Sequence, residues 1–207
     1  MEDFASLSVH EFLDATAKRI PVPGGGAVAA LSGALSSAMA RMVAAYSIGK
    51  NTSEQVRPKI EEVSKRLSRA DHLFRALMTQ DAEAYASMTA AAKARREESE
   101  SGSKDYQDAV LAAIGVPMEM AALAADTLET LDSFKTMASR HLISDLGVAT
   151  VLADATAQTA AYSVRINLRE LAASDLRIKI EADLDKTLDR CTAGRDSLER
   201  FVKEVLE

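Results

Sequence analysis

The sequence is short of the residues that build metal and disulfide sites. It has one cysteine, Cys191, and three histidines, His10, His72 and His141. A lone cysteine excludes a disulfide framework and a cysteine-based zinc site. The histidines lie far apart in the chain, without the spacing of metal ligands. We therefore expect structural or surface roles for them, and no metal site is predicted.

The chain also lacks a basic block and a long apolar run. Charged residues make up 27% of the chain and the net charge is −6, with both signs interspersed, which argues against nucleic acid as a partner. The first residues have neither the basic region nor the apolar run of a secretory signal. Residues 20–40 carry no charge, but they begin with Pro and Gly and end at Arg41, too short for a membrane span. A soluble cytoplasmic protein that binds no membrane is the expectation.

No segment alternates with the period of a strand over enough residues to compete with helix. Apolar residues instead recur at spacings of three and four, and the chain is predicted to form a single domain, 1–207. The expected helices cover residues 8–18, 26–48, 54–95, 106–131, 142–171 and 175–206. Residues 96–105 are expected to be a mobile linker, and Pro117 to kink the fourth helix. The fold class predicted is all-α, an up-and-down bundle of long antiparallel helices.

The stretch that begins at residue 21 reads PVPGGG and leads directly into a helix. The prolines stop what precedes them, and Gly24, Gly25 and Gly26 leave backbone N–H groups bare at the helix start. Such a terminus is suited to bind an anion or another ligand. The alternative is that the glycines only let the chain turn tightly.

Helix lengths predict which residues share an end of the bundle. Lys50 lies roughly 36 Å beyond Gly26 along the second helix, and Asp81 lies about 40 Å back up the third. One end should therefore gather Gly24–Gly26, Asp81 and Asn167, and the other end Lys50 and Asp145. At about 100° per residue, the fifth helix carries a row of polar residues along one edge of its apolar stripe: Asp145, Thr156, Ser163 and Asn167. Asp154 lies on the opposite side of that helix and is expected to be solvated.

Three separated motifs carry a resemblance to a known family. They are PxPGGGxxAAxxGAxxxAxxxMV at residues 21–43, DAEAY at 81–85, and SDLGVAxxLAxAxxxxAxxxVRINL at 144–168. In this order they resemble the cyclodeaminase domain of formimidoyltransferase-cyclodeaminase, whose stand-alone bacterial relatives include methenyltetrahydrofolate cyclohydrolases. The resemblance spans essentially the full chain.

The resemblance implies an enzyme of folate one-carbon metabolism that forms an α-helical homodimer. A cyclodeaminase closes 5-formimidoyltetrahydrofolate to 5,10-methenyltetrahydrofolate with loss of ammonia, and a cyclohydrolase opens the methenyl bridge with water to give 10-formyltetrahydrofolate. Either reaction needs a group that moves a proton on or off nitrogen, and no metal or cofactor beyond the tetrahydrofolate substrate. A diverged, non-catalytic folate-binding bundle is the remaining alternative.

The resemblance also implies roles for individual residues. Asp81 is the expected proton-transfer group, with an exposed surface aspartate as the alternative. Gly24, Gly25 and Gly26 would meet the substrate through backbone N–H groups, Lys50 would attract a glutamate carboxylate of a polyglutamylated tail, and Asp145 and Asn167 would bind the pterin edge. We expect a two-fold dimer that brings the Lys50 end of one chain to the glycine end of the other. The chain departs from the family at Asn51, His141 and Ser163.

Overall fold

The computed structural model describes residues 3–50, 52–97 and 101–207, and the side chains of residues 97 and 101–103 are not considered further. Within these ranges the chain is almost entirely helical and has no strand. The elements are η1 (Phe4–Ser6), α1 (Val9–Ala17), α2 (Gly25–Tyr46), α3 (Arg57–Glu97), α4 (Ser101–Phe134), η2 (Lys135–Met137), η3 (Arg140–Leu142), α5 (Ile143–Leu168) and α6 (Asp175–Leu206).

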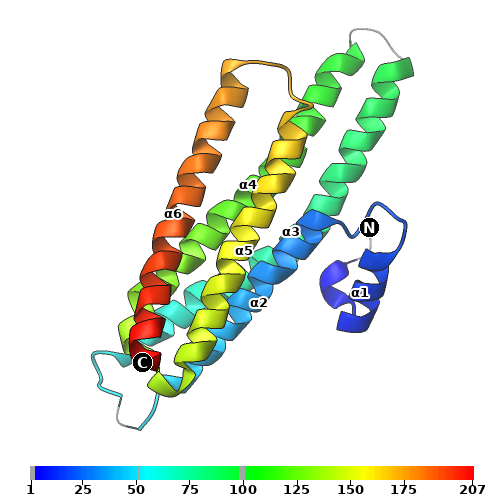
Figure 1. Ribbon diagram of the computed structural model, residues 1–207. Coiled ribbons are helices and arrows are strands. Elements are labelled where there is room, and N and C mark those ends of the chain that lie inside the picture. The colour runs from blue at the N-terminus through cyan, green and yellow to red at the C-terminus, as the bar shows by residue number, and fades with distance from the viewer. Residues whose placement is uncertain (1–2, 51, 98–100) are drawn as a thin grey trace.

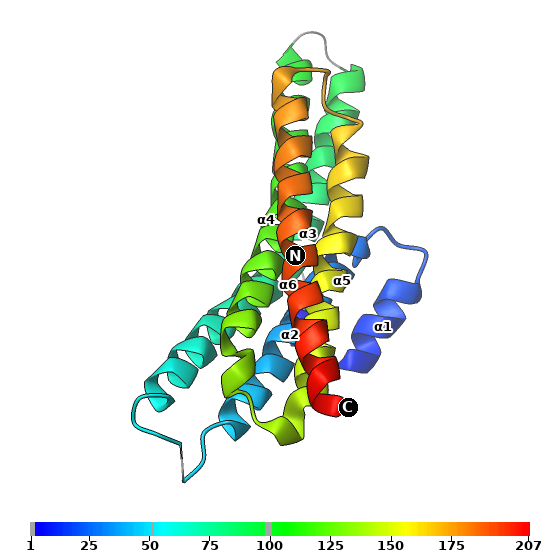
Figure 2. The same ribbon diagram turned by 60° about the vertical axis from the view of Figure 1, so that its left-hand side comes forward.

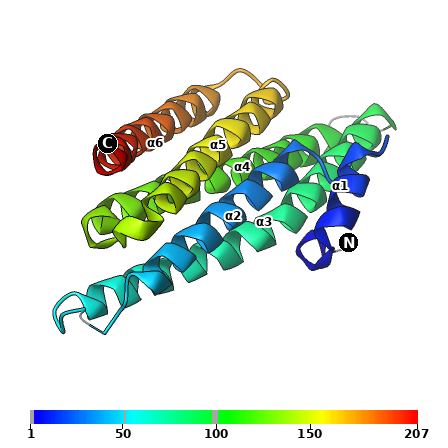
Figure 3. The same cartoon turned by 60° about the horizontal axis from the view of Figure 1, so that its bottom comes forward.

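The five long helices run up and down in sequence, as predicted (Figure 1). Helices α2, α3, α4 and α5 pack around one core, and α6 packs on α4 and α5 (Figure 3). Helix α1 lies on the outside of the bundle (Figure 2), beside α2 and α3 (Figure 3). The bundle therefore confirms the fold class that the sequence predicts.

Local chemistry fixes several helix ends. Ser8 and Glu11 form a reciprocal capping box at the start of α1, and the Ser174 side chain accepts a hydrogen bond from the backbone N–H of Arg177 at the start of α6. Helix α2 differs, because its first flanking residue is Gly24, which offers no side chain as a cap. The first turn of α2 is thus open to a partner from elsewhere in the chain.

The region 96–105 was predicted as a linker, and this prediction is largely wrong. Helix α3 continues to Glu97 and α4 begins at Ser101, while residues 98–100 lie outside the described residues. The Lys, Arg and Glu residues around this connection are good helix formers, and propensity outweighs the low-complexity composition. Helices α3 and α4 consequently extend beyond the N-terminal end of α2 (Figure 1).

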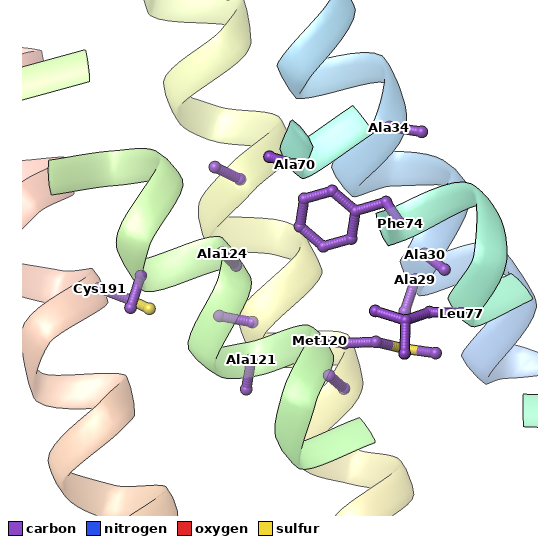
Figure 4. Packing of buried hydrophobic residues seen from close by; sticks show 14 of the residues in the cluster. Ala29, Ala30, Ala34, Ala70, Phe74, Leu77, Met120, Ala121, Ala124 and Cys191 are labelled. Carbon is purple, nitrogen blue, oxygen red and sulfur yellow. The ribbon is translucent and has the colours of Figure 1, made fainter. Parts of the chain in front are cut away.

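The core is built from alanine on α2 and larger side chains on α3. Figure 4 shows the Phe74 ring in a cluster of buried residues that includes Ala30 and Ala34 of α2 and Ala70 of α3 itself. At Gly33, an added Cβ would lie 2.5 Å from a ring carbon of Phe74, so the absence of a side chain lets α3 approach α2 closely.

Two helical segments, Gly25–Tyr46 and Lys104–Met137, are long and apolar enough to cross a membrane. In the bundle, however, 56% and 44% of the respective 18-residue windows are buried, so length and composition are weak evidence for a membrane span.

Candidate active site

A cavity of about 450 Å³ lies over the N-terminal end of α2. Helix α2 begins there, whereas α3 and α4 continue past it, so the cavity occupies space that a longer α2 would fill. Its walls come from four segments distant in sequence: Pro21, Val22, Gly24, Gly25, Gly26, Asp81, Tyr85, Met88, Thr89, Ala92, Tyr106, Ala113, Ser163, Ile166, Asn167 and Glu170.

Asp81 of α3 reaches the first turn of α2 and takes the place of the missing cap. Burial raises the pKa of the Asp81 carboxyl above its usual range, and a hydrogen bond from the backbone N–H of Ala27 opposes part of that rise. Asp81 is half-buried rather than exposed on the helix surface. A partly desolvated carboxyl group inside a cavity can give or take a proton closer to neutral pH than an ordinary aspartate can.

Gly26 makes this approach possible. A Cβ added at Gly26 would overlap the Asp81 carboxyl group, whereas a Cβ at Gly25 would meet nothing within 4 Å. No glycine among the described residues has a positive φ, so a special turn conformation is not what the glycines supply here. At Gly26 the requirement is space for Asp81.

The cavity brings together one of the two groups that helix lengths predicted. Gly24–Gly26, Asp81 and Asn167 all line it. On α5, the Asn167 side-chain amide donates a hydrogen bond to the Ala113 carbonyl of α4 at 2.8 Å. These residues therefore share one site.

The other predicted group lies elsewhere in the chain. Lys50 is exposed, just beyond the end of α2, and Asp145 lies in the first turn of α5. By the helical rise, the 22 residues of α2 separate Lys50 from the cavity by about 33 Å. Neither residue contacts the cavity of its own chain, and Asn51 lies outside the described residues.

Two residues not predicted from the sequence, Tyr106 and Glu170, complete the cavity at its end away from α2. The Tyr106 hydroxyl donates a hydrogen bond to Glu170 Oε2 at 2.7 Å. Burial, followed by the neighbouring Glu170, raises the pKa of the Tyr106 phenol. The Arg95 guanidinium lies 4.1 Å from the centroid of the Tyr106 ring. No short motif marks this cluster, because its members come from three different helices or helix ends.

The charge of the lining limits which ligand groups it can accept. Its ionisable carboxyl groups are Asp81 and Glu170, and none of the lining residues is lysine or arginine. Hydrogen-bond donors suit such walls better than anionic groups do. The cavity therefore fits a donor-rich ring system, with any anionic tail lying outside it.

Asp154 was expected to be solvated, and this expectation is wrong. It is 8% exposed and pairs with Arg195 Nη1 of α6 at 3.2 Å.

Cys191, on α6, lies near Asp154, and burial raises the pKa of its thiol to about 12. In the part of the chain that the structure describes, no group of three or more His, Cys, Asp or Glu residues is placed to hold a metal ion.

Comparison with known proteins places this chain in a family. A family model described as formiminotransferase-cyclodeaminase matches residues 8–186. The chain is 28% identical to a methenyltetrahydrofolate cyclohydrolase of Methylorubrum extorquens over 167 residues, 79% of this chain and 80% of that protein. It is 26% identical to the formimidoyltransferase-cyclodeaminase of Rattus norvegicus over 173 residues, 82% of this chain but only 32% of the rat protein.

The fold agrees with these sequence matches. The crystal structure of a formiminotetrahydrofolate cyclodeaminase from Thermotoga maritima superposes with a TM-score of 0.88 at 27% identity, and the match covers 98% of both chains. Because the family model covers most of the sequence, the chain belongs to the formiminotransferase-cyclodeaminase family.

Proposed function

We propose that the protein is a 5-formimidoyltetrahydrofolate cyclodeaminase, which closes the 5,10-methenyl bridge and releases ammonia. One observation carries the proposal: a carboxyl group with a raised pKa, Asp81, lies against the bare first turn of α2 inside a cavity of about 450 Å³. The proposal also rests on membership of a family whose relatives act on the one-carbon unit of tetrahydrofolate.

The proton balance of ring closure explains why such a group is needed. N10 attacks the formimidoyl carbon and its proton passes to the imino nitrogen, which gives a tetrahedral carbon bonded to N5, N10 and an amino group. The C–N bond to the amino group then breaks, and ammonia departs with one proton more than the neutral substrate supplies. A protonated carboxyl group beside the leaving nitrogen supplies that proton, and burial favours the protonated form.

Each wall of the cavity has a task in this proposal. Asp81 transfers the proton, and the N–H groups of Gly25 and Gly26 in the first turn of α2 bind acceptor atoms of the substrate, because the Ala27 N–H already donates to Asp81. Asn167 and Glu170 face the donor groups of the pterin. No bond change in the reaction is a redox step, so the proposal needs no cofactor beyond the folate itself.

Cyclohydrolase activity is the second candidate, because the stand-alone relative of Methylorubrum extorquens, which matches along 80% of its length, carries that name. In that reaction water attacks the methenyl carbon and a proton is released, so Asp81 would act as a base. The ionised carboxylate would then be the active form.

The absorbance of the methenyl bridge separates the candidates. With 5-formimidoyltetrahydrofolate, a cyclodeaminase builds this absorbance and releases ammonia in equal amount. With 5,10-methenyltetrahydrofolate, a cyclohydrolase removes the absorbance faster than buffer alone. A protein that binds tetrahydrofolate and changes neither signal is a non-catalytic folate-binding bundle, and the proposed function is then wrong.

We further propose a two-fold homodimer in which the Lys50 and Asp145 end of one chain approaches the cavity of the other. Support comes from apolar side chains that α2 and α5 leave exposed, with Leu35 at 51% and Tyr162 at 70%. Lys50 would then meet the glutamate tail of a polyglutamylated substrate. Light scattering tests the dimer, and Lys50→Ala should raise the KM of a polyglutamylated substrate more than that of the monoglutamate.

A further inference from the structure

Pro117 interrupts the hydrogen bonding of α4 next to the cavity. Helix α4 runs through this proline without a break. Proline has no backbone N–H, so the carbonyl group four residues earlier, that of Ala113, loses its helical partner. Ala113 is 5% exposed and lines the cavity. Its carbonyl oxygen therefore needs another donor, since a buried polar group without a hydrogen bond is unfavourable.

Asn167 is that donor. Its Nδ2 atom lies 2.8 Å from the Ala113 carbonyl oxygen and donates to it across the interface between α5 and α4. A carbonyl oxygen can only accept a hydrogen bond, so the NH₂ half of the amide must face it. The orientation of the Asn167 side chain is thereby fixed, and its Oδ1 atom is left as an acceptor. Asn167 is itself a lining residue of the cavity.

We propose that Pro117 is a positioning residue: it frees the Ala113 carbonyl to hold the Asn167 amide, whose Oδ1 then accepts a hydrogen bond from the donor edge of a reduced pterin. This inference rests on the proposed function, because it assumes that the cavity binds a tetrahydrofolate. A reduced pterin presents ring N–H groups and an amino group along its edge. An amide that was free to rotate would present a donor to those groups in half of its orientations.

The chemistry also explains why an amide serves at position 167. A carboxylate there would place two acceptors against the Ala113 carbonyl, and an aliphatic side chain would leave that carbonyl without a donor. One amide meets both needs, a donor for the protein and an acceptor for the ligand. Pro117 and Asn167 therefore form one unit, although 50 residues separate them in the sequence.

Pro117→Ala is the informative variant, because stability and binding should change in opposite directions. Alanine restores the N–H and takes the Ala113 carbonyl back into the helical ladder, which releases the Asn167 amide. Alanine is also much the better helix former, so the thermal midpoint should stay the same or rise. We expect the Kd for tetrahydrofolate and the KM to rise about tenfold, the effect of one lost hydrogen bond, with kcat little changed.

Two comparisons complete the experiment. Pro58→Ala, at the start of α3, removes a proline that lies far from the cavity lining, and it should leave Kd and KM unchanged. Asn167→Ala should raise the KM about as much as Pro117→Ala. In the double variant the two effects should not multiply, since both changes remove the same contact.

Three results would overturn the inference: a Pro117→Ala protein that binds tetrahydrofolate as tightly as the wild type, one with a lower thermal midpoint, or effects that multiply in the double variant. Isothermal titration with tetrahydrofolate distinguishes these outcomes from failure of the proposed function. If the wild-type protein does not bind tetrahydrofolate, the proposed function falls and this inference with it. If the wild type binds and Pro117→Ala binds equally well, only this inference falls.

Discussion

Replacing Gly26 by alanine tests the contact on which the site depends. The added Cβ would overlap the Asp81 carboxyl group, and that side chain has to move away from the first turn of α2. The hydrogen bond from the Ala27 N–H to the carboxyl group is then lost. We expect the fold to remain while the proton-transfer group is displaced.

Two opposing terms keep the change in stability small. Losing a helix cap costs about 1 kcal/mol, and replacing glycine by alanine in a helix gains about the same. The free energy of unfolding should therefore change by less than about 1 kcal/mol. The loss of activity should be far larger, because a misplaced catalytic group costs about 100-fold in kcat.

Gly25→Ala is the matched control, since it lies one residue earlier in the same turn and its Cβ would meet nothing within 4 Å. It gains the same helix propensity without touching Asp81, so it should lose much less activity than Gly26→Ala. Urea denaturation gives the stability of both variants, and methenyl absorbance gives kcat. Equal kcat values for Gly26→Ala and the wild type would refute the reasoning.

Three further predictions concern Asp81, the core and the thiol. Burial raises the pKa of Asp81 in the folded state, so the wild type loses stability as pH rises through that raised pKa. The free energy of unfolding of Asp81→Asn should therefore increase relative to that of the wild type as pH rises. Denaturation at several pH values measures this difference, and a difference that decreases with pH would contradict the prediction. Gly33→Ala should lower the free energy of unfolding by up to about 2 kcal/mol, because its Cβ would lie within 2.5–2.7 Å of three Phe74 ring carbons. Gly115→Ala should raise the free energy of unfolding, because its Cβ would meet nothing within 4 Å and alanine is the better helix former. Urea denaturation compares the two variants. With its pKa raised to about 12, the buried Cys191 thiol should resist a thiol reagent at neutral pH until the protein unfolds, and fast labelling of the folded protein would contradict this.

The helices were largely predictable because their signals are local. The capping residues Ser8 and Ser174 mark their helix starts in the sequence and do so in the structure. The connection between α3 and α4 was predicted less well. Its composition is typical of a linker, yet the helices continue to Glu97 and from Ser101. The Lys, Arg and Glu residues on either side favour helix, and the packing of α3 against α4, which the composition does not reveal, adds to that preference.

The site was predictable only where helix geometry carries information along the chain. The rise per residue is enough to place Asp81 level with the glycines of α2. It says nothing of Tyr106 and Glu170, which meet across 64 residues, because their contact depends on how α4 packs beside the end of α5. Asp154 was assigned to solvent for a related reason: the pattern of α5 does not show that α6 covers that side.

The most direct test of the proposed mechanism is the rate at which Asp81→Asn forms the methenyl absorbance from 5-formimidoyltetrahydrofolate, with tetrahydrofolate binding measured on the same preparation. Asparagine keeps the size and an acceptor for the Ala27 N–H, so binding should persist while kcat falls by about 100-fold or more. A variant that binds the folate and turns over as fast as the wild type would contradict a proton-transfer role for Asp81.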